Sequence, residues 1–301
     1  MKYKFLLFTL TLFITSFVSA QSIGLVGPAT PFGDWPNASN PAPDIMLTDN
    51  GDGTHSVNGV TLEDTGNGNE VKFRTGQDWS LDDYGGTSSP ASFPTGTANI
   101  GGFNIPVTAG TYDITLDLNN NTYAFTASFG FENGLPPNWS NVDETAVGFD
   151  WEFTDGGTDF NPQDLFSGQF AIIDSDAAGS GAGNVKASLI SGPIDVSTYS
   201  NGVILSFDHL YRHLNSSAKV FVSNDGGANY SLINEYTSTQ GSFSGPSPVD
   251  VTPVSAEFNI TSYIGSANDI QLKFEYDDLD NWAWYWMVDN VTVEEAPSCP
   301  E

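Results

Sequence analysis

Two carboxylates stand in otherwise apolar, strand-like segments at the two ends of the chain's second half. Glu132 lies in FENGLPPNW (131–139) and Asp289 in WYWMVDNVTV (284–293). A carboxylate among inward-facing aromatic side chains is costly unless it is paired or bound to a cation. The acidic DSDAAGSG segment adds Asp174 and Asp176. Because Ca²⁺ prefers hard oxygen ligands, these four carboxylates are candidate ligands of a structural Ca²⁺. The alternative is a set of unrelated surface carboxylates.

The first half of the chain carries side chains suited to binding sugars. Trp35, Trp79 and Tyr84 occur among Gly, Asp and Pro residues, a context typical of exposed loops. Lys72 and Arg74 are two residues apart in a predicted strand, so they point to the same face. Aromatic rings stack on the apolar faces of a neutral glucan, and basic side chains donate hydrogen bonds to its hydroxyl oxygens.

Each of these residues also has a purely structural interpretation. A Trp in a small β-sandwich commonly belongs to the core. Lys72 and Arg74 could instead pair with Asp78, Asp82 or Asp83, as surface ion pairs worth about 0–1 kcal/mol. In that case the module would have no ligand site.

The closing strand holds Trp282, Trp284 and Trp286 at a spacing of two residues, which predicts one shared face. This stripe fits the core of a sandwich better than a sugar platform.

Catalytic signals are weak. His209 and His213 lie in the strand-like FDHLYRHL without a third zinc ligand at a recognisable spacing. No nucleophile elbow, phosphate loop or dinucleotide fingerprint occurs, so the sequence predicts no enzyme.

The composition is strongly acidic and rich in aromatic residues. The chain has 301 residues, with 37 Asp and Glu against 8 Lys and Arg and a formal charge of −29. Such a charge disfavours nucleic acid and anionic lipid as partners. With 13% aromatic and 39% hydrophobic residues the chain can build cores, and its length favours two domains.

The N-terminus predicts export. Lys2 and Lys4 precede an apolar run, and the small residues Ser19 and Ala20 suit cleavage before Gln21. The run is short of the roughly 20 apolar residues that a transmembrane span needs. The single cysteine, Cys299, excludes a disulfide framework. We therefore expect a secreted or cell-surface chain without direct membrane insertion.

Alternating strands separated by Gly- and Pro-containing turns predict an all-β fold. TYDITLDL, NNN and TYAFTAS (111–128) read as an antiparallel hairpin. We expect a signal peptide over 1–20, a first β-sandwich over 21–126 and a second over 127–296. Residues 297–301 would be a linker or the start of a further domain.

The second half resembles the jelly-roll domains of the cleaved-adhesin or choice-of-anchor class, which are similar to MAM domains. The resemblance covers roughly 128–295. It rests on FENG with PPNW, FAIIDSDAAGSG, LISGPIDVSTYSNGVILSFDHLYR, VFVSNDGG and WYWMVDNVTV, in that order. It implies a Ca²⁺ site at Glu132 and Asp289, with a looser match for Asp174 and Asp176.

The first half resembles the SusE/SusF-type outer-membrane starch-binding module over roughly 23–126. The motifs are IGLVGPATPFGDW, VTLEDTGNGNEVKFRTGQDWSLDDYGG and the AGTYDITLDLNNNTYAFT hairpin. The resemblance implies an immunoglobulin-like sandwich and a binding platform of paired aromatics with a basic residue. Trp35, Lys72 and Trp79 match it, and Tyr84 and Arg74 match more loosely.

Together these features predict a secreted, non-catalytic, polysaccharide-utilisation protein that binds a neutral polysaccharide, with an α-glucan favoured. A Ca²⁺-stabilised jelly roll would be its accessory domain. Two alternatives remain open. The chain could be the targeting region of a truncated secreted hydrolase, or a cell-surface adhesin with a protein partner.

Overall fold

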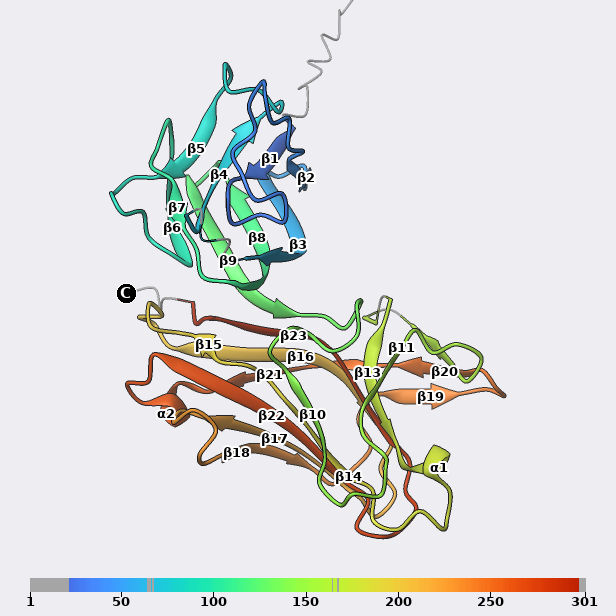
Figure 1. Ribbon diagram of the computed structural model, residues 1–301. Coiled ribbons are helices and arrows are strands. Elements are labelled where there is room, and N and C mark those ends of the chain that lie inside the picture. Colours follow the sequence, from blue (N-terminus) through green and yellow to red (C-terminus); the bar gives the residue numbers. More distant parts are fainter. Residues whose placement is uncertain (1–21, 64–65, 67, 164, 167, 298–301) are drawn as a thin grey trace, which may run out of the picture.

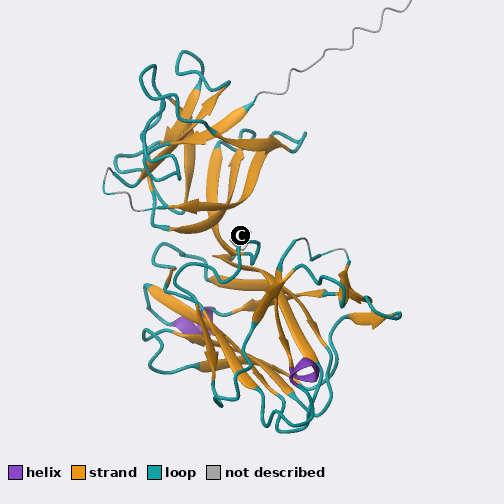
Figure 2. Ribbon diagram, turned by 45° about the vertical axis from the view of Figure 1, so that its right-hand side comes forward, coloured by secondary structure: helices purple, strands orange, loops and turns teal. Residues whose placement is uncertain are grey.

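The computed structural model describes residues 22–63, 66, 68–163, 165–166 and 168–297, which form two strand-rich units stacked end to end (Figure 1). The predicted leader and Cys299 lie outside the described residues. Strands dominate both units (Figure 2), which confirms the predicted all-β class. Two four-residue helices, α1 (Ser175–Ala178) and α2 (Thr261–Ile264), complete the described secondary structure. Neither has the length and apolar character needed to cross a membrane.

The N-terminal unit is a ring of strands closed on itself. Its strands pair in the order β9-β6-β5-β4-β1-β2-β3-β8, and β8 then pairs with β9 to close the ring. Closure leaves no long free sheet edge and encloses one core. The short strand β7 pairs with β4. The bounds are β1 (Ile23–Val26), β2 (Ile45–Asp49), β3 (Thr54–Leu62), β4 (Glu70–Thr75), β5 (Asp83–Gly86), β6 (Thr95–Ile100), β7 (Ile105–Pro106), β8 (Gly110–Asp117) and β9 (Thr122–Phe129).

The predicted hairpin is confirmed as β8 and β9. Tyr112, Ile114 and Leu116 of β8 are buried, and the residues between them are less so, as expected for a strand with one face in a core. Asp117 faces Thr122 across the turn. Asn121 takes a positive φ of 53° in that turn, a conformation that Asn tolerates better than most residues.

The C-terminal unit has two antiparallel layers, as a jelly roll requires. One layer contains β11-β13-β23-β16-β21, and the other is β10-β14-β22-β17-β18 with β15 against β22. A small third sheet has the order β12-β20-β19, with β12 and β20 parallel. The bounds are β10 (Ser140–Asp143), β11 (Glu152–Thr154), β12 (Phe160–Pro162), β13 (Phe170–Asp174), β14 (Lys186–Ile190), β15 (Ile194–Asp195), β16 (Val203–Tyr211), β17 (Ser217–Ser223), β18 (Ser231–Tyr236), β19 (Ser242–Ser244), β20 (Val249–Thr252), β21 (Val254–Asn259), β22 (Asp269–Asp277) and β23 (Tyr285–Glu295).

Aromatic side chains fill the space between the two main layers. Trp286 of β23 packs against Trp151 with ring centroids 5.4 Å apart and against Phe274 of β22 at 5.9 Å. Phe207 of β16 meets Phe274 edge to face at 5.1 Å. Large rings from both layers therefore meet in one fully buried core, and ring contacts of this kind add to the gain from burial.

Strand β9 belongs to both units. Its residues Thr122–Ala127 pair with β8 of the N-terminal ring. Its last three residues, Ala127, Ser128 and Phe129, pair with Val293, Thr292 and Val291 of β23. Figure 1 shows β9 running out of the upper unit and ending beside β23. No flexible linker separates the units at this junction, because one continuous strand is hydrogen-bonded into each.

This shared strand predicts that damage at Ala127 spreads to both units. Ala127→Pro removes a backbone donor from a residue that faces both Tyr112 and Val293. Amide exchange in β8 and in β23 should therefore become faster. Ala124→Pro is the matched control, since Ala124 pairs with Thr95 and Thr115 of the N-terminal unit. It should accelerate exchange in β6 and β8 more than in β23. Unchanged protection of β23 in Ala127→Pro would contradict the coupling.

Candidate functional site

Trp35 and Trp79 come together on the N-terminal unit, as the predicted platform requires. Trp35 lies in the loop between β1 and β2, and Trp79 lies in the turn between β4 and β5. Their ring centroids are 6.0 Å apart with an interplanar angle of 60°. The Trp79 Nε1 donates a 2.7 Å hydrogen bond to the Pro36 carbonyl, which ties the turn to the loop. The Trp79 side chain is still 38% exposed, so part of it faces solvent in a fixed orientation.

A buried ion pair supports the turn that carries Trp79. Arg74 donates from Nε and Nη2 to the two carboxylate oxygens of Asp44, at 2.8 and 2.5 Å. Both side chains are almost completely buried. The Arg74 Cζ lies 5.0 Å from the centroid of the Trp79 ring, within reach of a cation–π interaction. Arg74 therefore acts below the platform and is unlike the freely exposed sugar contact that its sequence position indicated.

Gly24 of β1 leaves the room that Asp44 occupies. A Cβ at position 24 would lie 2.5 Å from the Asp44 Cβ and 2.6 Å from its Oδ2. Local spacing pointed to Asp78, Asp82 or Asp83 as partners of Arg74, whereas Asp44 lies 30 residues from Arg74 along the chain. The pairing of β1 with both β2 and β4 brings the two together.

The other two predicted glycan contacts have structural positions. Lys72 forms an ion pair with Asp83, which is one of the three acidic partners that the sequence allowed. Both side chains are mostly buried. Tyr84 is only 8% exposed and lies in β5 opposite Phe73 of the core. The expectation of an exposed Tyr84 is wrong, because β5 is a ring strand with this side chain turned inward.

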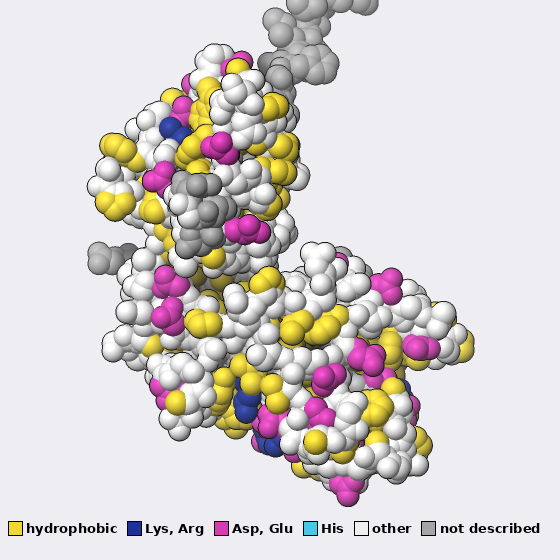
Figure 3. Space-filling view, in the orientation of Figure 1, with side chains coloured by type: hydrophobic (Ala, Val, Ile, Leu, Met, Phe, Trp, Pro, Cys, Tyr) yellow, Lys and Arg dark blue, Asp and Glu magenta, His cyan; other side chains and the backbone are white. Residues whose placement is uncertain are grey.

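Two apolar side chains flank the Trp79 turn. Met46 is exposed on β2, and its Sδ accepts from the Gln77 Nε2 at 3.2 Å. Leu81 is exposed in the same turn as Trp79. Together with Trp35 and Trp79 they form a surface that we call the Trp79 patch. Figure 3 shows hydrophobic side chains exposed over the N-terminal unit and few basic ones, as suits a neutral ligand with apolar faces.

Asp289 is the most unusual carboxylate of the C-terminal unit. It is fully buried, and neither of its oxygens has a hydrogen-bond partner. The backbone groups of Asn290 and Phe131 act to lower the pKa of this carboxylate. Burial outweighs them and, with the charges of Glu132 and Asp208, raises the pKa of Asp289 to about 7. A cation at this place would relieve the cost of burying the charge.

Glu132 and Asp208 face Asp289 from two other segments. Asp208 of β16 is the cross-strand neighbour of Asp289. Its carboxylate accepts from the Ser255 Oγ at 2.6 Å and from the Asn290 Nδ2 at 2.9 Å. Glu132 accepts from the Gln169 backbone amide at 3.0 Å. Glu132 lies near enough to Asp289 for its charge to raise the pKa of that carboxyl, and a cation shared by the two stays a prediction. Asp208 is an additional neighbour that the sequence did not single out.

Asp174 and Asp176 do not join this group. Asp174 pairs with Tyr285 across β13 and β23, four residues from Asp289, which corresponds to roughly 13 Å along the strand. Its Oδ1 accepts from the backbone amides of Asp176 and Ala177 and so caps α1. Asp176 is exposed. The looser match of these two residues to a shared Ca²⁺ site is therefore wrong in geometry. Across the described ranges, no three His, Cys, Asp or Glu side chains converge as a metal site by themselves.

The three closing tryptophans separate instead of sharing a face. Trp286 is in the core, and Trp284 packs against the Arg212 guanidinium, whose Cζ is 3.6 Å from its ring centroid. Trp282 precedes β23, is 49% exposed, and donates from Nε1 to the Asp176 carbonyl at 3.2 Å. His209 is also a core residue. Burial lowers its pKa to about 4, and its Nδ1 accepts from the Trp286 Nε1 at 3.3 Å.

Comparison with solved structures finds likenesses to adhesin and carbohydrate-binding domains. The K1 cleaved adhesin domain of Lys-gingipain from Porphyromonas gingivalis W83 matches with a TM-score of 0.43 and 21% identity, over 57% of this chain and 99% of that domain. The CBM27-1 module of Caldicellulosiruptor saccharolyticus, solved with mannohexaose, gives 0.40 and 15%, over 57% and 98%. TmCBM61 with β-1,4-galactotriose gives 0.33 and 12%, over 56% and 94%.

These likenesses assign neither a family nor a ligand to the chain, since every one of the three has a TM-score below 0.5. No protein-family model and no curated protein matches the sequence.

The ion pair beneath the Trp79 patch generates a stability prediction. Asp44→Asn removes the carboxylate that pairs with the buried Arg74 guanidinium, which should destabilise the chain by about 3–5 kcal/mol. Asp82→Asn is the matched control, because Asp82 is exposed in the same turn, and it should change stability by less than about 0.5 kcal/mol. Urea unfolding followed by tryptophan fluorescence measures both. Equal midpoints for the two variants would show that the ion pair does not support the unit.

Proposed function

We propose that this chain is a non-catalytic glycan-binding protein that acts outside the cell and binds a neutral polysaccharide through the Trp79 patch. The observation that carries the proposal is the exposed Trp79, whose indole is tied to the Pro36 carbonyl and packs against the partly exposed Trp35. A rigid indole loses little conformational entropy when a sugar ring stacks on it. The patch also lies on a strongly negative chain, which disfavours anionic polysaccharides.

An α-glucan is the ligand that we propose for the patch. Support for this choice comes from the resemblance of the first half of the chain to starch-binding modules. Two tryptophans at an angle of 60° form a bent surface, and a bent surface suits the curved shape of an α-glucan chain better than a flat ribbon-like glucan. Lys72 and Arg74 are held in ion pairs, so stacking should dominate over hydrogen bonds from basic side chains.

The aromatic patch can be tested by affinity electrophoresis through gels that contain amylose, pullulan, xylan, laminarin, mannan or galactan. The chain from Gln21 onward should be retarded by an α-glucan. Trp79→Ala should weaken that binding at least roughly tenfold, the loss expected for a central aromatic contact.

Trp282→Ala is the matched control for this experiment, because Trp282 is the same type of side chain and is also exposed, in the other unit. It should be retarded like the unmodified chain. If Trp79→Ala is retarded as fully as the unmodified chain, or if only Trp282→Ala loses retardation, glycan binding does not occur at the Trp79 patch.

We propose that the C-terminal unit binds a structural Ca²⁺ near Asp289. The two orphaned oxygens of this buried carboxylate and the neighbouring Glu132 supply ligands of the hard type that Ca²⁺ prefers. Asp208 lies close enough to contribute to the negative potential. Because these carboxylates are too few for 6–8 oxygen ligands, the remaining positions would be taken by backbone carbonyls and water.

Calcium binding predicts a change in thermal stability. Adding Ca²⁺ at about 100 times its Kd should stabilise the chain by about 2.7 kcal/mol, and chelation should reverse the gain. Asp289→Asn should abolish the response. In the presence of chelator near neutral pH, this variant should be at least as stable as the parent chain. The reason is that burial disfavours the charge of the Asp289 carboxylate, and the substitution removes that carboxylate.

Asp174→Asn is the control for the calcium experiment and should keep the full response, since Asp174 caps α1 at another place. If neither Ca²⁺ nor chelator changes the melting temperature of the parent chain, the proposed Ca²⁺ site is wrong. If only Asp174→Asn loses the response to Ca²⁺, the Ca²⁺ site lies at α1 instead.

Adhesion to a protein is a second candidate function, favoured by the loop before β23. Leu279 is 54% exposed and lies in the same loop as Trp282. Leu279, Asp280 and Trp282 all have positive φ, at 54°, 59° and 46°. Bulky residues rarely adopt this conformation, and such strain concentrates at functional loops. A loss of cell adhesion in Trp282→Ala with intact glycan binding would support this function.

A further inference from the structure

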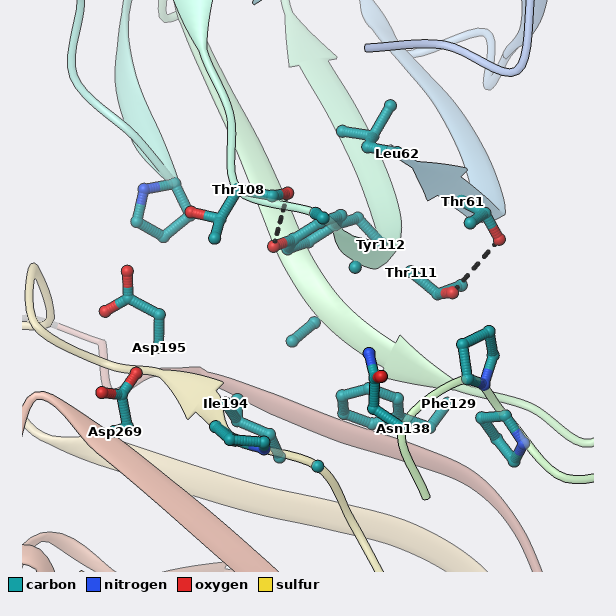
Figure 4. Close-up of a pocket in the computed structure, with 18 of the residues that line it drawn as sticks. Thr61, Leu62, Thr108, Thr111, Tyr112, Phe129, Asn138, Ile194, Asp195 and Asp269 are labelled. Carbon is teal, nitrogen blue, oxygen red and sulfur yellow. Dashed lines mark hydrogen bonds between the residues drawn. The ribbon is translucent and has the colours of Figure 1, made fainter. Parts of the chain in front are cut away.

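A cavity of about 450 Å³ lies between the two units. This volume is within the range of about 300–1,000 Å³ typical of small-molecule sites, and it far exceeds the space of a few water molecules. The N-terminal unit contributes Tyr112 and Thr111 of β8, and the C-terminal unit contributes Ile194, Asp195 and Asp269. Figure 4 shows these walls facing each other across the opening, with β9 crossing from one to the other.

The cavity is held open by the covalent and hydrogen-bonded junction of the two units. Phe129, the last residue of β9, lines it and pairs with Val291 of β23. Tyr112 lines it from the neighbouring strand, and its hydroxyl donates to the Thr108 carbonyl at 3.2 Å. Strands β3, β8, β9, β15 and β22 contribute part of the lining, and loops complete it. The strand-built part of the site is pre-formed for a ligand.

The cavity lining combines apolar rings with polar side chains, and its charged side chains are all negative. Tyr112, Phe129, Pro193 and Tyr199 offer rings that can contact the C–H face of a sugar. Thr111 and Asn138 supply neutral hydrogen-bonding groups. The charged lining residues are all acidic, namely Glu63, Asp195 and Asp269.

Asp195 and Asp269 stand directly opposite each other on β15 and β22. Like charges in this relation destabilise a sheet. Neither forms an ion pair with any basic side chain of the described residues. Asp195 accepts one hydrogen bond, from the Ser197 backbone amide at 2.8 Å. Figure 4 shows both carboxylates on the cavity side of their strands. Most of their acceptor capacity is therefore free for a ligand.

We infer that this interdomain cavity is a second saccharide site, distinct from the Trp79 patch, and that it prefers a sugar bearing a protonated amine. The rings would contact the sugar face, and Asp195 and Asp269 would accept hydrogen bonds from its hydroxyl and ammonium groups. A uronic sugar would be rejected by the three carboxylates. The choice of a saccharide rests on the proposed glycan-binding function, whereas the preference for an amine follows from the charge of the cavity.

Isothermal titration of the chain from Gln21 onward can test the order of preference. The probes are a β-1,4-linked glucosamine disaccharide, cellobiose and digalacturonic acid, all at low salt. The glucosamine disaccharide should bind roughly three- to tenfold more tightly than cellobiose, the gain expected from one or two solvent-accessible ion pairs. Digalacturonic acid should not bind. High salt should reduce the preference for the amine.

Two variants locate the binding. The double variant Asp195→Asn, Asp269→Asn should remove the preference and keep cellobiose binding, whereas the exposed control Asp280→Asn should change neither. Thr108→Trp, which inserts a ring from an exposed loop position on the rim, should block both sugars. Equal binding of amino and uronic disaccharides, or full binding to Thr108→Trp, would overturn the inference.

Failure of this site and failure of the Trp79 patch are distinguishable. Trp79→Ala should bind the glucosamine disaccharide like the parent chain, even where it has lost retention in polysaccharide gels. A loss of disaccharide binding in Trp79→Ala would mean that the cavity is not the site.

Discussion

Strand β9 is hydrogen-bonded into both units, and much of the molecule's geometry depends on that pairing. Its first part closes the N-terminal ring against β8, and its end extends the C-terminal layer against β23. Because a single strand cannot bend freely while it is paired at both ends, the junction fixes how the units face each other. The interdomain cavity and the separate position of the Trp79 patch both follow from this constraint.

Most of the fold could be predicted from local patterns. The alternation in β8 and β9 and the Asn run between them indicated the hairpin, because a strand with one buried face has a period of two. The ring closure and the sharing of β9 could not be predicted in this way. They depend on which strand edges meet, and the pattern of β9 does not reveal that its last three residues pair with β23, more than 160 residues later.

The candidate sites show the same division between local and long-range information. Trp35 and Trp79 were recognisable because Gly, Pro and Asp around them indicated loops, and the structure brings the two rings together. Tyr84 had similar neighbours but lies in a strand that faces the core. The Arg74–Asp44 pair depends on ring strands that are adjacent in space and distant in sequence. Glu132 and Asp289 were identifiable as carboxylates in apolar segments. Asp174 falls elsewhere because the register of β13 on β23 places it opposite Tyr285, and Asp176 lies in α1.

The most direct test of glycan binding at the Trp79 patch is a nitrogen–proton NMR titration of the indole groups with maltoheptaose. The chain has seven tryptophans, and each gives one indole signal. We expect the signals of Trp35 and Trp79 to shift in a saturable manner while those of the buried Trp139, Trp151 and Trp286 stay in place. A saturable shift confined to Trp282 or Trp284, or no shift at all with maltoheptaose, would contradict the proposed site.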